Sequence, residues 1–252
     1  MNQLQAYAAA RLGSLAEEPL FRTLAADPAP GRSLQMLGHL TFWSSTFQDI
    51  TLLNLARVRD PLLREIVSTH QDEDAGHEQW FIDDLLLVFG KLPDVVAVFD
   101  PVYRPAREVC FELMSEVFHC ESDWERVALP IALEEGGKVF LPRMIEHFER
   151  VGLASALSAL GTRHAQSEAL HALHSDDTAT VLGAFEMPMA ARARSNAMVD
   201  RITGTFKRFA AILETAIRDC SPAAEAQIAR RIGRVLSRSE LIETTRHEST
   251  ES

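Results

Sequence analysis

The sequence predicts an all-α fold. Apolar residues recur at spacings of three and four positions along almost the whole chain, and the period-two alternation of β-branched residues that marks strands is nearly absent. The 252 residues include only 12 glycines and 11 prolines, fewer than turn-rich β architectures use. We therefore expect about seven or eight helices. They form one domain over residues 1–220, followed by a polar tail over residues 221–252 that is either helical or disordered.

Proline, glycine and aspartate divide the first half of the chain into three expected helices. The first ends at the stretch DPAPG, residues 27–31, and the second covers residues 38–58. The third begins at Pro61, behind an aspartate cap, and ends at GKLP, residues 90–93. The second helix is rich in aromatic residues, which suit core packing better than the wall of a pocket.

The same signals divide the second half of the chain. They lie at Pro101 and Pro105, at Pro130 and Pro142, at Gly152, and at Ser221-Pro222. The two prolines at 130 and 142 start or kink a helix that contains LEEGG. Gly152 opens a helix that runs toward residues 175–177, and a long helix follows over about residues 190–219.

Charge and cysteine content exclude several classes of function. The formal net charge is −11, which disfavours binding to nucleic acid or to anionic membranes, because both need a basic face. The three cysteines have no CxxC spacing and favour a reducing cytoplasm over a disulfide framework. No window approaches the ~18 apolar residues of a membrane span. We therefore expect a cytoplasmic protein with a small-molecule substrate and leave a homodimer open.

One histidine pattern occurs twice and carries the chemistry. The stretches HQDEDAGH and HAQSEALH both have the form H-x3-[D/E]-x2-H. On a helix these three positions fall at about 0°, +40° and −20°, so their side chains leave one narrow stripe. The six residues are His70, Asp74 and His77 in the first match and His164, Glu168 and His171 in the second.

Both stripes are expected to face the core. Leu153, Leu157 and Leu160 share the helix face of His164, and apolar residues flank the first match in the same way. An isolated carboxylate in an apolar core costs several kcal/mol, and neutral imidazoles there also need partners. A metal ion satisfies both, and histidine nitrogens with carboxylate oxygens are the ligand set of non-heme iron.

A third contribution comes from the helix containing LEEGG. Glu135 shares its face with apolar residues, whereas Glu134 shares its face with Lys138, so Glu135 is expected to be the buried carboxylate. Six ligands from three helices suit two metal ions with open positions for dioxygen and substrate. The expected ligands are Asp74, His77, Glu135, His164, Glu168 and His171, with Asp74 and Glu135 as the candidate catalytic carboxylates.

These motifs resemble those of the heme-oxygenase-like diiron oxidases. The block DEDAGHEQWFIDDLLLVFG, the pattern ALEEGG and the His164 helix resemble the three metal helices of that superfamily in order and spacing, over about residues 30–215. The resemblance implies a seven-helix fold with a short C-terminal tail, two ferrous ions, dioxygen as co-substrate and oxidation of a small metabolite. Some members have a glutamate where this chain has His70, so His70 is either a ligand or a donor beside the site. Glu73 lies about 60° off the stripe and is expected to be a partly exposed helix residue rather than a ligand.

The leading hypothesis is therefore an oxygen-dependent diiron oxidase or oxygenase. Its substrate would be a small amine- or carboxylate-bearing metabolite, and the outcome oxidative C–C cleavage, decarboxylation, desaturation or N-oxygenation. A ferritin-like iron store is one alternative, because its carboxylate-x-x-His units have the same spacing. A metal-free, thiaminase-like member of the same fold is another, and it would need a nucleophile instead of a metal.

Overall fold

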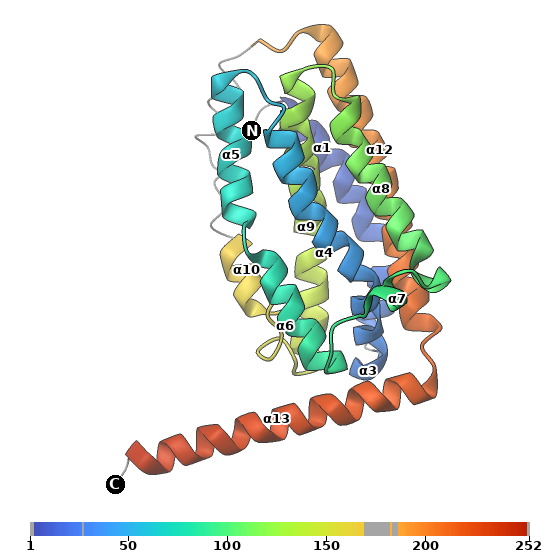
Figure 1. Ribbon diagram of the computed structural model, residues 1–252, viewed down its shortest axis with the longest axis vertical. Helices are drawn as coiled ribbons and strands as arrows, with labels where there is room; N and C mark the ends of the chain where they lie inside the picture. The colour runs from blue at the N-terminus through green and yellow to red at the C-terminus, as the bar shows by residue number, and fades with distance from the viewer. Residues whose placement is uncertain (1–2, 27, 169–181, 183–185, 251–252) are drawn as a thin grey trace.

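The protein is a bundle of helices, as the sequence predicts (Figure 1). The computed structural model describes residues 3–26, 28–168, 182 and 186–250, and these contain no strand. The α-helices are α1 (Gln3–Gly13), α2 (Pro19–Ala25), α3 (Pro30–Ser33), α4 (Leu37–Leu55), α5 (Pro61–Asp74), α6 (His77–Phe89), α7 (Val95–Val98), α8 (Arg104–His119), α9 (Asp123–Arg150), α10 (Thr162–Glu168), α12 (Met189–Arg218) and α13 (Pro222–Thr250). Short 3-10 turns lie at Ser14–Glu17, Leu34–Met36 and Pro101–Tyr103.

Helix α9 lies at the centre of the bundle and contacts α1, α2, α5 and α12. Residues 127–134 are buried in succession, so this part of the helix has no solvent face. The helix runs unbroken through Pro130, which cannot donate a hydrogen bond to the carbonyl of Arg126. The buried side chain of Asn54, on α4, donates to that carbonyl at 2.7 Å instead. Pro130 therefore lies inside the helix and does not start it.

The third expected helix is two helices. Ala75 is extended and Gly76 is left-handed with φ = 94°, a conformation that favours glycine, so α5 ends at Asp74 and α6 begins at His77. The side chain of Gln48, on α4, donates to the carbonyl of Asp74 at 2.8 Å and satisfies one of the acceptors that the helix end exposes. The first histidine motif is consequently divided between two helices.

The helix expected from Gly152 onward does not begin there. Gly152 has φ = 75° and follows the end of α9, and the chain then turns several times before α10 begins at Thr162. Leu153, Leu157 and Leu160 are buried as expected, but they lie in this turn segment. The described residues thus form more helical segments than the expected seven or eight, because Gly76 divides one expected helix and short helices such as α3 and α7 lie between the long ones.

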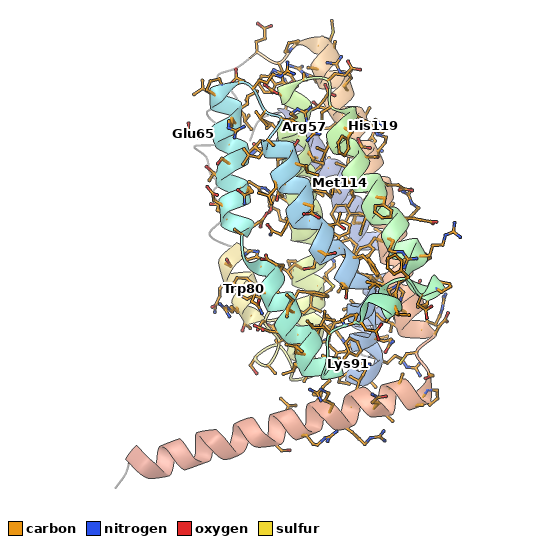
Figure 2. The ribbon with its side chains drawn as sticks, viewed as in Figure 1. Arg57, Glu65, Trp80, Lys91, Met114 and His119 are labelled. Carbon is orange, nitrogen blue, oxygen red and sulfur yellow. The ribbon has the colours of Figure 1, made fainter. Side chains whose placement is uncertain are left out.

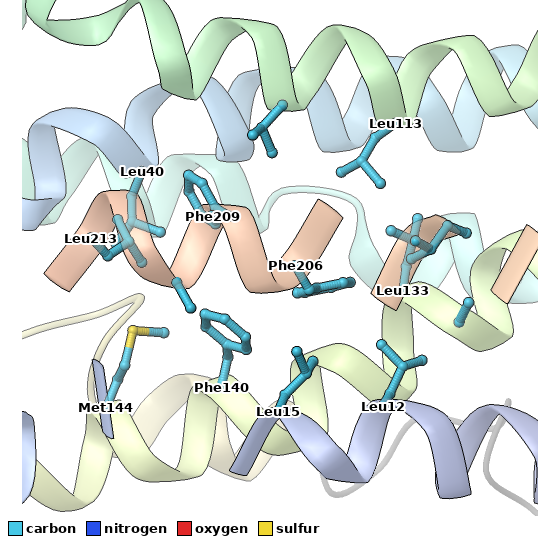
Figure 3. Packing of buried hydrophobic residues seen from close by; sticks show 14 of the residues in the cluster. Leu12, Leu15, Leu40, Leu113, Leu133, Phe140, Met144, Phe206, Phe209 and Leu213 are labelled. Atoms are coloured by element: carbon cyan, nitrogen blue, oxygen red, sulfur yellow. The ribbon is translucent and has the colours of Figure 1, made fainter. Parts of the chain in front are cut away.

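Aromatic side chains pack where α4, α9 and α12 meet. The ring of Trp43 lies 4.8 Å from the rings of both Phe206 and Phe209, and the ring of Phe140 lies 5.4 Å from that of Phe206. Figure 3 shows Phe140, Phe206 and Phe209 among the leucines of the core. A Cβ atom on Gly136 would lie 2.3 Å from the Phe206 ring, so glycine at 136 permits the close approach of α9 and α12.

Helix α13 covers most of the segment predicted as a polar tail. Its first turns cross the end of the bundle, against α3 and α6 (Figure 1). Ile228 and Ile232 are 3% and 5% exposed and belong to the hydrophobic core. Arg231 donates to the carbonyls of Leu86 and Leu87 at 2.9 and 2.8 Å and so caps the C-terminal end of α6. No helix in the described part of the chain has the length and hydropathy needed to cross a bilayer.

We predict that the Ile232→Ala substitution lowers the free energy of unfolding by about 2–4 kcal/mol, because it removes buried methyl groups and leaves a cavity between α13 and the bundle. Denaturant unfolding of the full chain measures the effect. The exposed neighbour Arg230 provides the control, and Arg230→Ala is expected to change stability by no more than about 0.5 kcal/mol. Equal stability of the two variants would mean that α13 is not part of the core.

Candidate metal centre

Three buried side chains from two helices converge inside the bundle. The Nε2 atom of His70 lies 2.7 Å from Oε1 of Glu134 and 3.1 Å from Oδ2 of Asp74. One ligand atom from each residue lies within 4.8 Å of the other two. The three residues are no more than 5% exposed. We refer to His70, Asp74 and Glu134 as the buried triad.

The helices position the buried triad through simple spacing. His70 and Asp74 are four residues apart on α5, so they lie on the same helix face. That face packs against α9, which contributes Glu134. The side chain of Asp60 caps the start of α5 by accepting hydrogen bonds from the backbone N–H groups of Leu62 and Leu63, both at 3.0 Å. Helix α5 is thus anchored at one end by Asp60 and at the other by Gln48.

The prediction that Glu135 is the buried carboxylate and Glu134 the partner of Lys138 is wrong. Glu134 is 5% exposed and bonds to His70, whereas Glu135 accepts a hydrogen bond from Nζ of Lys138 at 2.5 Å. The apolar neighbours did not distinguish the two positions, because α9 is buried on all sides up to residue 134. A lysine also reaches a carboxylate three residues before it as readily as one four residues before it.

His77 and His164 form a second group beside the buried triad. Nδ1 of His77 lies 3.6 Å from Oδ1 of Asp74, and the rings of His77 and His164 lie 4.8 Å apart. Trp80 stacks on His77 at 4.3 Å and meets the edge of His164 at 5.4 Å. Figure 2 shows Trp80 where α6 faces α10. His164, the first residue of the second motif, therefore lies beside His77, the last residue of the first motif, although the first motif is broken by Gly76.

The remaining predicted residues have different outcomes. Glu73 is half-buried and lies outside the buried triad. His70, which the sequence left open between ligand and neighbouring donor, is a member of the triad. The side chain of Glu168 and all of His171 lie outside the described residues, so their predicted role as ligands stays a prediction.

Asp84 is a buried carboxylate that the sequence analysis missed. It lies on α6 and is 1% exposed. Its two oxygens accept hydrogen bonds from the backbone N–H groups of Ser158, Ala159 and Leu160 at 2.6, 3.0 and 3.1 Å. The carbonyl of Ala159 in turn lies 2.7 Å from Nδ1 of His164. Asp84 therefore holds the turn that orients His164, and its position seven residues after His77 on α6 is the only sequence signal that pointed to it.

The bond to Ala159 determines which nitrogen of His164 can bind a metal. A carbonyl oxygen only accepts, so Nδ1 must carry the proton and Nε2 carries the lone pair. Metal-binding histidines are usually oriented in this way, by a hydrogen bond from the ring nitrogen that does not bind the metal. With Nδ1 bonded to Ala159, Nε2 is the nitrogen of His164 that could bind a metal ion.

The donor set of the buried triad fits a transition-metal ion. Metal–ligand bonds near 2.1 Å place adjacent ligand atoms about 3 Å apart, which is the separation observed between His70 and the two carboxylates. Imidazole with carboxylates is the donor set of non-heme iron. Two buried carboxylates are stabilised by positive charge nearby. A divalent ion at this point would balance both.

A mostly apolar cavity of about 180 Å³ adjoins the centre. Asp74, His77, Glu134 and His164 contribute to its wall, and side chains of α4, α6, α9 and α12 complete it. Trp43 and Phe47 pack against the core, as expected, and they also line the cavity.

We predict that Asp84 makes stability depend on pH. Burial raises the pKa of Asp84 from an ordinary value of 3.8 to about 6. The three backbone hydrogen bonds favour the charged form and act in the opposite direction, but the effect of burial is larger. A raised pKa favours the protonated folded form, so this contribution to stability is present below pH 4 and is lost as the pH rises through 6. The free energy of unfolding of the wild type minus that of Asp84→Asn should therefore grow by about 2–3 kcal/mol between pH 7 and pH 4. Denaturant unfolding across this range measures it.

The exposed neighbour Asp83 provides the matched control for that measurement. Asp83→Asn removes a neighbouring charge that contributes only the smallest part of the raised pKa of Asp84, so it should change the pH dependence of stability by less than Asp84→Asn does. A flat difference for Asp84→Asn would contradict the role assigned to Asp84.

Comparison with known proteins adds no assignment. No protein-family model matches the chain, and no curated protein matches it. The function is therefore argued from the sequence motifs and the geometry of the site.

Proposed function

We propose that the protein is a non-heme diiron oxidase or oxygenase that uses molecular oxygen to oxidise a small amine- or carboxylate-bearing metabolite. The observation that carries this proposal is the buried triad, two carboxylates and an imidazole converging beside an apolar cavity. We further propose that the helices form the heme-oxygenase-like fold implied by the resemblance of the motifs.

The described residues suggest how two ions would be held. His70, Asp74 and Glu134 would hold one ion, with Glu134 in the place first expected for Glu135. His77 and His164, whose rings lie 4.8 Å apart, would contribute to the second. Glu168 and His171 are proposed to complete the ligand set of the second ion, because they continue the His-x3-Glu-x2-His pattern of His164.

The protein's own residues would provide charge, orientation and the exclusion of water. Bound ferrous iron supplies electrons for the reduction of dioxygen. Asp74 and Glu134 provide negative charge in a buried place, where its effect is least screened by solvent. The turn held by Asp84 would keep His164 in the tautomer whose Nε2 can bind the metal ion. The aromatic and aliphatic wall of the cavity keeps water from the reacting atoms.

The cysteines disfavour the metal-free, thiaminase-like alternative. Burial raises the pKa of Cys110 to about 11 and that of Cys120 to about 12, so both thiols are protonated at neutral pH. A protonated thiol is a poor nucleophile. Iron storage remains the alternative to an enzyme, and the fate of iron and oxygen distinguishes the two.

We predict that the wild type, loaded anaerobically with ferrous iron, binds about two ions per chain, and that Glu134→Gln binds about one. The substitution keeps the shape of the side chain but removes the charge that an ion needs. Iron and protein concentrations of the desalted samples measure the ratio. The adjacent Glu135→Gln, which breaks only the contact with Lys138, should retain about two ions. Loss of iron from the Glu135 variant but not the Glu134 variant would contradict the assignment.

We also predict that oxygen consumption depends on an organic substrate. An oxidase consumes oxygen together with its organic substrate, whereas an iron store oxidises iron whatever metabolite is present. Oxygen uptake by the iron-loaded protein, with and without candidate amines and carboxylic acids, measures this dependence. Uptake that ignores every compound, together with ferric iron far beyond two per chain, would favour storage.

A further inference from the structure

The cavity beside the metal centre lies along one stripe of α9. Residues of this helix that line it are spaced three and four apart, and they are Leu133, Glu134, Gly137, Phe140, Leu141 and Met144. Glu134, a member of the buried triad, stands near one end of the stripe and Met144 at the other. Figure 3 shows Phe140 and Met144 pointing from α9 toward Leu40 of α4 and Phe209 of α12, across the space between these helices.

Gly137 stands in the middle of that stripe and creates the hollow. A Cβ atom added at 137 would meet no atom within 4 Å, so the space in front of it is open. Its backbone is helical, without a positive φ, and neither the turn geometry nor close packing requires a glycine there. Gly136, the preceding residue, differs because its missing side chain is replaced by the ring of Phe206. Glycine destabilises a helix relative to alanine. At Gly137 no close packing contact compensates for that loss of stability.

The size and the wall of the cavity define what fits. A dry cavity of about 150 Å³ holds one benzene molecule, so the 180 Å³ found here holds about six to eight non-hydrogen atoms. Most lining side chains are aliphatic or aromatic, and the described ones include neither lysine nor arginine. Residues 169–185 contain no lysine or arginine in the sequence either. Neither the described lining residues nor residues 169–185 therefore offer a lysine or arginine that could pair with a substrate carboxylate inside the cavity.

We propose that Gly137 keeps open a pocket for the apolar part of the substrate, a short alkyl chain or a single ring of about six to eight non-hydrogen atoms, and so limits substrate size. This inference rests on the proposed function, because it gives the cavity to the substrate of the metal centre. The polar head of the substrate stays outside the apolar part, toward the metal centre or toward the side chains of Gln48 and Glu78, which line the same cavity.

Binding of small apolar probes to the iron-loaded full chain tests the proposal. The probes are benzene, for a single ring, and the straight-chain alcohols from propanol to decanol, for an alkyl chain. Trp43 lines the cavity, so tryptophan fluorescence under anaerobic conditions reports occupancy, and the melting temperature gives an independent measure. The variants are Gly137→Ala and Gly137→Leu. Gly204→Ala and Gly204→Leu are the controls, because Gly204 also lies within a helix, a Cβ there would meet only the end of the Arg208 side chain at 4.0 Å, and it does not line the cavity.

We expect the wild type to bind benzene, or to bind the straight-chain alcohols up to a limiting chain length. Gly137→Ala should shorten that limit by one or two carbons, and Gly137→Leu should weaken binding of every probe by about tenfold or more. Both variants should retain the iron content of the wild type, and both Gly204 variants should bind as the wild type does. Binding of benzene alone or of alcohols alone supports the proposal and identifies the group as a ring or a chain.

Two results would overturn the inference. They are the absence of probe binding to the iron-loaded wild type, and unchanged binding in Gly137→Leu with iron content intact. Failure of the proposed function gives a different result, because the wild type would then bind no iron in the same samples.

Discussion

The constraint on which the structure depends is the burial of two carboxylates beside one imidazole. Asp74 and Glu134 are each no more than 5% exposed, and each lies within about 3 Å of the same nitrogen of His70. Burying an uncompensated carboxylate costs several kcal/mol, and a cation bound between α5 and α9 would lower that cost for both acids. A structural role alone gives no reason to place both acids there, because apolar residues of similar size would pack at lower cost. The presence of both acids therefore supports the proposed metal site.

Side chains from neighbouring helices hold the backbone around this cluster. Asn54 donates to the carbonyl that Pro130 leaves without its helical partner, and Gln48 donates to the carbonyl of Asp74 where α5 stops. Asp84 accepts three backbone N–H groups in the turn before α10. Each contact satisfies backbone groups at an irregularity next to the site, where an unpaired buried group would cost about 1–3 kcal/mol. Specific side chains therefore stabilise the break in hydrogen bonding at Pro130, the end of α5 and the turn before α10.

The sequence predicted the class of fold, and the structure brings His77 and His164 of the two motifs side by side, but the local geometry between them was not predicted. Helical spacing correctly placed His70 and Asp74 on one face, because both lie within α5. It failed for His77, since Gly76 changes the chain direction by a left-handed conformation that periodicity does not encode. It failed in the same way for the segment after Gly152, whose leucines have helical spacing and are buried without being helical. In both places the apolar pattern reported burial and not secondary structure.

Helix α9 contains two pairs of identical adjacent residues, Glu134-Glu135 and Gly136-Gly137. These pairs explain why sequence spacing could not locate the site on this helix. Adjacent helical residues point about 100° apart, so only one glutamate of Glu134-Glu135 and one glycine of Gly136-Gly137 can face the same space. The structure selects Glu134 and Gly137, which are three residues apart and share a face. A rise of 1.5 Å per residue separates them by about 4.5 Å along the axis, roughly the length of three to four carbon–carbon bonds. A molecule lying along α9 would then have its reacting carbon near the buried triad and its apolar remainder over Gly137. The same helix would in this way fix both where oxidation occurs and how large a group is accepted.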